Sequence, residues 1–76
     1  MNEKYKLLDN DTINFLGNKL YRIEALKGFG DVRKGHKGGY VQNESNLSSS
    51  GNSWVYDNAW VYGNAQVYGN ARVYGD

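Results

Sequence analysis

The sequence contains no cysteine and no proline. Without cysteine, neither a disulfide nor a cysteine-ligated metal can stabilise a chain of 76 residues, a size at which one hydrophobic core gives only marginal stability. The single histidine and the scattered carboxylates match no recognised metal-ligand spacing. The sequence therefore predicts one small domain with no metal or other cofactor, stabilised by its packing or by a partner.

Long apolar runs are also missing. No segment is long enough for a transmembrane helix or for the apolar core of a signal peptide, which makes a cytoplasmic location the default expectation. The formal net charge of +1 gives no general reason to expect a nucleic acid or a membrane as partner. Residues 1–44 carry eight of the nine Lys and Arg and six of the eight Asp and Glu, so the remainder of the chain is almost uncharged.

The last 23 residues form a six-residue repeat. Each unit has a valine followed by a tyrosine, and the first three units have an alanine four places after the valine. The valines are Val55, Val61, Val67 and Val73. This period fits neither an α-helix nor a simple alternating strand. It predicts a β-solenoid in which the valines and alanines point inward, Gly-Asn pairs turn the corners and about 18 residues close one triangular turn.

An aliphatic residue followed four positions later by a small one resembles the motif of the hexapeptide-repeat proteins, which are left-handed parallel β-helices. The segments 31–32, 38–39, 46–48 and 54–57 also resemble the N-terminal region of longer, uncharacterised bacterial and phage proteins of this kind. The resemblance implies an all-β fold with a left-handed parallel β-helix, of which residues 41–76 would form two turns. A short antiparallel cap is expected before it in residues 1–40, and the two parts together would make one compact domain. The frame places Val41, Leu47 and Val55 in one turn and Val61, Val67 and Val73 in the next. The tyrosine after each aliphatic residue departs from the family pattern, where that position is often small or acidic.

The charged N-terminal part predicts the cap. After a frayed start at residues 1–4, short strands are expected at 5–8, 12–15 and 20–26, separated by turns at 9–11 and at Gly17-Asn18. An antiparallel cap of this kind would cover the unpaired backbone groups of the first solenoid turn.

A glycine-rich basic loop is expected at residues 27–40. Its candidate anion-binding residues are Arg33, Lys34, His36 and Lys37. Two interpretations remain open. Flexible glycines and cationic side chains could hold a phosphate, or the segment could be a tight connection with a solvated charged rim, since its spacing matches no known phosphate-binding fingerprint.

Aromatic side chains flank the valines and are expected to face outward, where residues one turn apart stack Tyr56 on Tyr74 and Trp54 on Arg72. The candidate partner-binding residues are Trp54, Tyr56, Trp60, Tyr62, Tyr68, Arg72 and Tyr74. Such stacks can stabilise the coil through cross-strand pairing, and the same residue types are enriched at interface hot spots. The two interpretations are compatible.

The repeat stops after its second predicted turn, at Gly75-Asp76, which leaves a strand edge open with Asp76 as its only gatekeeper. We expect a second copy to cover this end in a closed tail-to-tail dimer. The function expected from the sequence is thus a non-enzymatic protein-interaction module that self-associates through its open C-terminal turn.

Two alternatives remain open. In the first, the chain is a small phage-encoded inhibitor that presents its aromatic face or basic loop to a host defence protein. In the second, it is a degenerate relative of the hexapeptide acyltransferases. The resemblance suggests this class of enzymes, which use a histidine base. His36 is the only histidine, and it precedes the repeats. The repeat alone is no argument for chemistry, so no catalytic residue is predicted.

Overall fold

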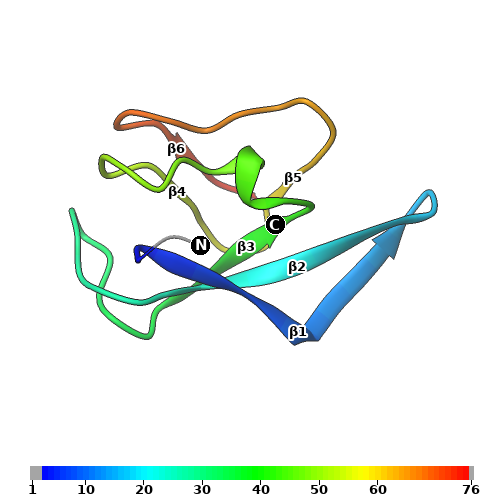
Figure 1. Ribbon diagram of the computed structural model, residues 1–76, viewed down its shortest axis with the longest axis horizontal. Helices are drawn as coiled ribbons and strands as arrows, with labels where there is room; N and C mark the ends of the chain where they lie inside the picture. The colour runs from blue at the N-terminus through cyan, green and yellow to red at the C-terminus, as the bar shows by residue number, and fades with distance from the viewer. Residues whose placement is uncertain (1–2, 76) are drawn as a thin grey trace.

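The computed structural model describes residues 3–75, which form strands, turns and one short 3-10 helix. A four-stranded sheet has the strand order β1-β2-β3-β5, and a separate two-stranded sheet pairs β4 with β6 (Figure 1). The elements in chain order are β1 (Tyr5–Phe15), β2 (Asn18–Ala25), β3 (Lys37–Val41), the 3-10 helix η1 (Glu44–Asn46), β4 (Trp54–Val55), β5 (Trp60–Val61) and β6 (Arg72–Val73).

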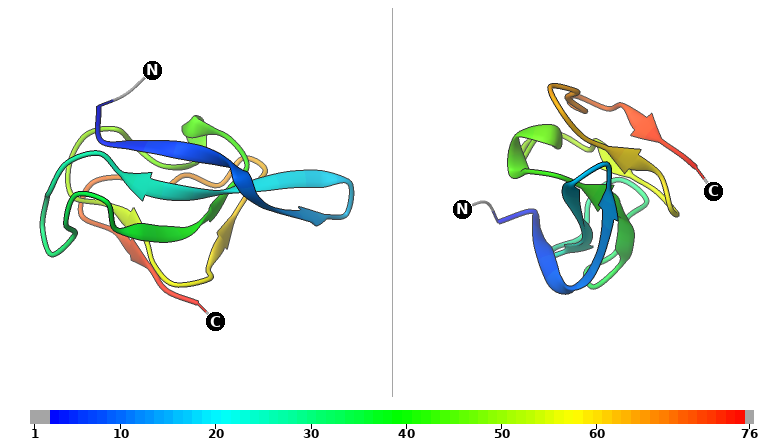
Figure 2. Two further views of the ribbon diagram at one scale, coloured as in Figure 1. Left: turned by 90° about the horizontal axis from the view of Figure 1, so that it is seen from below. Right: turned by 90° about the vertical axis from the view of Figure 1, so that its right-hand side faces the viewer.

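Strands β1 and β2 form a long antiparallel hairpin that extends beyond the rest of the molecule at its turn (Figure 2, left). The pattern predicted a turn at residues 9–11, but the chain runs through this segment as one strand with a shift in register between Leu8 and Thr12. Such a bulge bends a strand without ending it. The hairpin turn itself is Leu16-Gly17, one residue earlier than predicted, because Phe15 pairs with Asn18.

Strand β3 occupies part of the segment that the sequence predicted to be a loop. It pairs antiparallel with β2 on one side and parallel with β5 on the other, through Tyr40↔Trp60 and Val41↔Val61. Gly38 and Gly39 are buried here, and a Cβ on either would collide with the backbone of the β4 region or of Ala59. These glycines allow close packing and do not mark a flexible loop.

The repeat pairs in parallel at the predicted register. Val55 lies beside Val73 in the β4-β6 sheet, and Leu47 forms an isolated parallel bridge with Val67. Tyr56 stacks on Tyr74 with ring centroids 4.5 Å apart and planes 11° apart, and Trp54 pairs with Arg72, as predicted. Val61 and Val67 are buried, and Val73 is partly buried.

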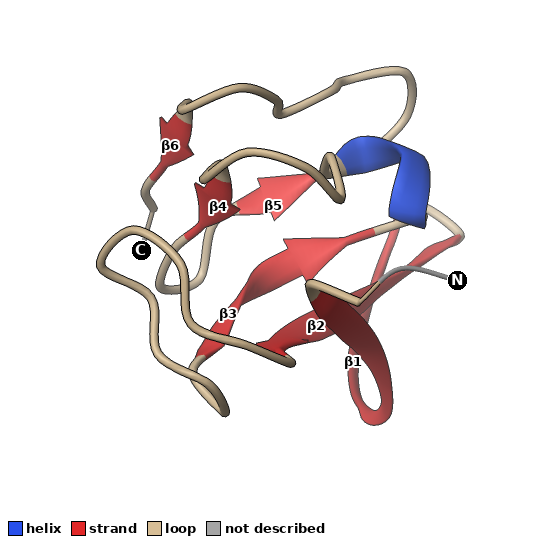
Figure 3. Cartoon of the chain, turned by 60° about the vertical axis from the view of Figure 1, so that its left-hand side comes forward, coloured by secondary structure: helices blue, strands red, loops and turns tan. Residues whose placement is uncertain are grey.

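The predicted two-turn left-handed parallel β-helix is nevertheless wrong. Antiparallel pairing of β2 with β3 draws the N-terminal hairpin into the same sheet as β5, so the molecule has a mixed four-stranded sheet and a small parallel sheet instead of a closed coil with a separate cap (Figure 3). The alanines of the repeat were all predicted to point inward, but only Ala59 is buried, whereas Ala65 and Ala71 are exposed.

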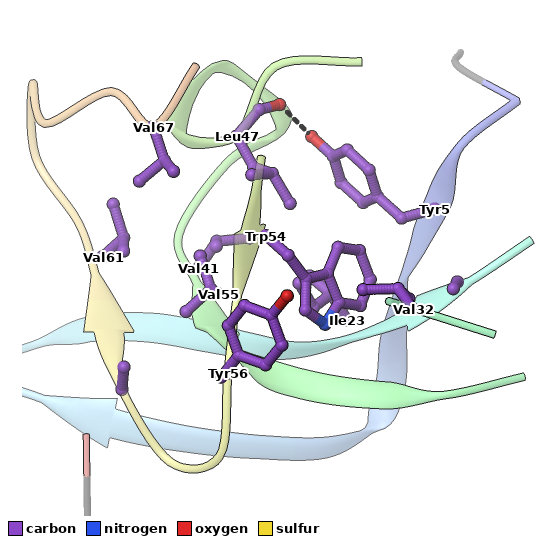
Figure 4. Packing of buried hydrophobic residues seen from close by; sticks show 12 residues of the cluster. Tyr5, Ile23, Val32, Val41, Leu47, Trp54, Val55, Tyr56, Val61 and Val67 are labelled. Carbon is purple, nitrogen blue, oxygen red and sulfur yellow. Dashed lines mark hydrogen bonds between the residues drawn. The ribbon is translucent and has the colours of Figure 1, made fainter. Parts of the chain in front are cut away.

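The core lies between the two sheets and contains Trp54, Ile23 and Val41 among its fully buried side chains (Figure 4). Tyr5 closes one side of it, because its hydroxyl donates to the Leu47 carbonyl at 2.5 Å and lies 2.9 Å from the Glu44 carbonyl. The sequence predicts a frayed start at residues 1–4, of which residues 1 and 2 lie outside the described range. Lys4, however, is buried, and its Nζ donates to Ser48 O and Ser53 Oγ. The start of the described chain is thus anchored in the fold.

Candidate interaction surface

The surface that stands out comprises the free edges of β5 and β6, which belong to different sheets and which we together call the C-terminal edge. Among residues 3–75, each of the two strands is paired on one side only within its sheet. Tyr40 N donates to Ala59 O and Gln42 N to Val61 O, while Trp54 N donates to Ala71 O and Tyr56 N to Val73 O. Because successive residues of a strand point their backbone groups to opposite sides, the amide and carbonyl of Trp60 and of Arg72 face away from these partners. The C-terminal edge therefore offers backbone hydrogen-bonding groups to another strand.

Large aromatic side chains are exposed in and near the strands of the C-terminal edge, and we call Trp60, Tyr62, Tyr68 and Tyr74 the aromatic rim. Trp60 is 43% exposed, Tyr62 41%, Tyr68 68% and Tyr74 59%. Four of the seven predicted partner-binding residues are thus exposed, and so is Arg72. Trp60 and Tyr62 lie beside Phe15 of the β1-β2 hairpin, whereas Tyr74 stacks on Tyr56.

Two of the predicted residues do not belong to this surface. Trp54 is fully buried, and its ring lies edge-on to Phe29 at a centroid distance of 5.3 Å and to Tyr5 at 6.3 Å. Tyr56 is only 9% exposed. The prediction that both are available to a partner is wrong, because the loop at residues 27–36 folds over them and extends the core beyond the β4-β6 sheet.

The charge of Arg72 is balanced by a carboxylate of the same chain, in an exposed ion pair. Its Nη1 lies 3.8 Å from Asp31 Oδ2, and the hydroxyl of Tyr56 donates to Asp31 Oδ1 at 2.6 Å. The hydrogen bond from Tyr56, with help from Arg72, lowers the pKa of the Asp31 carboxyl, so the carboxylate is ionised at neutral pH. Burial first, and this hydrogen bond second, raise the pKa of Tyr56 to about 12. The surroundings of the C-terminal edge are therefore close to electrically neutral.

The predicted anion-binding residues Arg33, Lys34, His36 and Lys37 are all exposed. They lie on a turn in which His36 N donates to Arg33 O, and Gly35 N donates to Ala25 O. Within residues 3–75 none of the four takes part in an ion pair. The His36 ring lies 6.4 Å from that of Tyr56, so the turn borders the Asp31 cluster. Its backbone amides at positions 35 and 36 are already bonded within the fold, and anion binding stays a prediction.

Sequence reasoning missed the tip of the β1-β2 hairpin. Phe15 packs against Trp60 and Tyr62 of the aromatic rim, with ring centroids 5.0 and 5.3 Å away. Leu16 beside it is 85% exposed. The only signal in the sequence was a leucine directly before a turn glycine, where a polar residue would be usual.

Residues 3–75 contain no group of three or more His, Asp or Glu side chains placed to hold a metal ion. Over the same residues, no helix is long and apolar enough to cross a membrane. Compared with known proteins, the chain matches no protein-family model and no curated protein. The resemblance to hexapeptide-repeat proteins stays a prediction.

Proposed function

We propose that this protein is a non-enzymatic protein-interaction module that self-associates through its C-terminal edge. The observation that carries the proposal is the free edges of β5 and β6, with backbone groups of Trp60 and Arg72 turned outward and exposed aromatic side chains in and next to both strands. An exposed strand edge is a template for another strand.

The two outer edges of the four-stranded sheet differ in a way that supports this choice. The β1 edge has a register shift, and the strand contains Lys6, Asp9 and Asp11. Bulges and charges are features by which proteins protect an edge from pairing. Strand β5 has neither, as its residues are Trp60 and Val61. Association is therefore expected at β5 and β6 and disfavoured at β1.

Charge favours a second copy as the partner. Between residues 58 and 75 the only formally charged side chain is Arg72, and Asp31 lies beside it. A copy related by a two-fold axis brings the same residues opposite one another, so a neutral surface meets no like charge across the axis. The pairing of β5 with β5 of the second copy would then be antiparallel.

The aromatic rim supplies most of the expected association energy. Strands β5 and β6 have two residues each, so backbone pairing contributes few hydrogen bonds. Trp60 alone is 43% exposed, and an aromatic side chain buries about 150–250 Å² in total. Covering its exposed part removes about 100 Å² from water, or about 2.5 kcal/mol at 25 cal/mol per Å², before the costs of association.

The experiment adds one lysine to either edge of the four-stranded sheet. Trp60→Lys removes an aromatic side chain and places like charges opposite each other at the two-fold axis. Asn10→Lys adds the same charge to exposed β1 and is the matched control. We expect light scattering to show dimers for the wild type and Asn10→Lys and monomers for folded Trp60→Lys at the same micromolar concentration. Equal dimerisation of the two variants would place the interface elsewhere, and a monomeric wild type would refute the proposal.

A further inference from the structure

The tip of the β1-β2 hairpin combines two unfavourable features in one residue. Leu16 has a φ of 52° and Gly17 a φ of 82°, so both residues of the turn are left-handed. Two-residue hairpin turns of this type favour Asn, Asp or Gly at both positions, and a left-handed leucine is strained. The side chain is also 85% exposed. Neither local conformation nor burial within one copy explains a leucine here, and such local conflicts concentrate at functional sites.

The hairpin tip is continuous with the rim of the C-terminal edge. Phe15, the residue before Leu16, lies 5.0 Å from Trp60 and 5.3 Å from Tyr62, measured between ring centroids. The hairpin projects beyond the sheets, with the tip farthest from the body (Figure 1). Leu16 therefore extends the aromatic rim past the end of β5.

We propose that Leu16 is an apolar anchor that contacts a second copy of this chain beside that copy's β5. This inference rests on the proposed function and names a part of the interface that the strand edges alone do not include. An antiparallel pairing of β5 across a two-fold axis places the Trp60-Tyr62 region of each copy opposite the same region of the other. Phe15 holds the tip against this region, so Leu16 lies within reach of the facing copy.

The character of the tip fits a copy of the same chain better than a charged partner. The residues that flank the turn are Asn14, Phe15 and Asn18, none of which carries a charge. The next charged residue along the chain is Lys19, whose Nζ lies 5.7 Å from the centre of the Tyr21 ring. Apolar contact between two uncharged surfaces leaves no buried charge unpaired.

The test exploits the strain at Leu16. Leu16→Asn provides the residue that the turn prefers, so the isolated chain should melt at the same temperature or higher, while the dissociation constant of the dimer rises at least tenfold. Leu16→Met keeps an apolar side chain of similar volume and should dimerise within about threefold of the wild type. Leu16→Gly, which also tolerates a positive φ, replaces the asparagine variant if that variant does not fold.

The outcomes separate the two proposals. If the wild type dimerises and Leu16→Asn dimerises equally well, the anchor is refuted while self-association through the C-terminal edge stands. If the wild type is monomeric at every concentration, both are refuted. Weakened dimerisation of Leu16→Asn with an unchanged or raised monomer melting temperature supports the anchor, because a purely structural role of Leu16 would lower both together.

Discussion

The close packing of β3 on β4 makes Gly38→Ala the most informative change in the fold. A Cβ at this position would lie 2.9 Å from both Cε2 and Nε1 of Trp54 and even closer to the carbonyl oxygen of Val55. Trp54 is fully buried and held between Tyr5 and Phe29. Neither the ring nor the Val55 backbone can move aside without disturbing the core, so β3 and β4 would have to separate.

The expected cost follows from this clash. Overpacking of a well-packed core costs about 1–3 kcal/mol, and displacement of two paired backbones adds to it. We expect Gly38→Ala to lower the free energy of unfolding by about 3 kcal/mol or more. A domain of this length has a total of about 4–11 kcal/mol, so the loss is a large fraction of the stability.

Urea unfolding followed by tryptophan fluorescence measures this loss. The matched control is Gly28→Ala, where the nearest atom to an added Cβ is Val32 O at an ordinary 3.5 Å. The control should unfold within about 0.5 kcal/mol of the wild type. If Gly38→Ala unfolded at the same urea concentration as Gly28→Ala, β3 and β4 would not be packed as described.

Two further predictions concern the residues that anchor the N-terminal strand. Tyr5→Phe removes the hydroxyl that donates to Leu47 O and should cost about 1–3 kcal/mol in urea unfolding, whereas Tyr68→Phe at an exposed site should cost almost nothing. Burial lowers the pKa of Lys4 to about 8, and stability should therefore rise as pH increases from 8 toward the unfolded value of 10.5. Burial raises the pKa of Tyr5 and Tyr56 to about 12, so stability should fall again above their unfolded value of 10.0. Urea midpoints measured across this range should pass through a maximum near pH 10, and Lys4→Met should lose the rise below it; a flat profile for the wild type would contradict the assigned burial.

The sequence predicted which residues of the repeat pair, because a six-residue period fixes register wherever one side of each strand is buried. The pairs Val41–Val61 and Val55–Val73 and the stack of Tyr56 on Tyr74 are all present. The closed coil was wrong for a reason that lies outside the repeat. The glycine-rich pattern around Gly38 and Gly39 predicts a loop. In the structure both residues lie in β3, where β4 and Ala59 approach them too closely for any side chain. A glycine that is needed for close packing looks the same in a sequence as one that is needed for a turn.

The exposed aromatic residues of the candidate surface could be predicted from the repeat, but the covered ones could not. Trp60, Tyr62, Tyr68 and Tyr74 are exposed as expected, since alternation along each strand places them opposite the buried valines. Trp54 and Tyr56 obey the same alternation but are covered by the loop that contains Phe29 and His36. Which outward-facing residues a distant loop covers depends on tertiary contacts, and a six-residue period contains no information about them. The sequence likewise did not reveal that Phe15 and Leu16 lie beside this surface, because their position also depends on tertiary contacts.

Sedimentation equilibrium of the wild-type chain over a series of micromolar concentrations is the most direct test of the proposal that β5 and β6 bind a second copy. We predict the mass of two chains at the upper end of the series and dissociation toward one chain on dilution. The mass of a single chain throughout the series would contradict it.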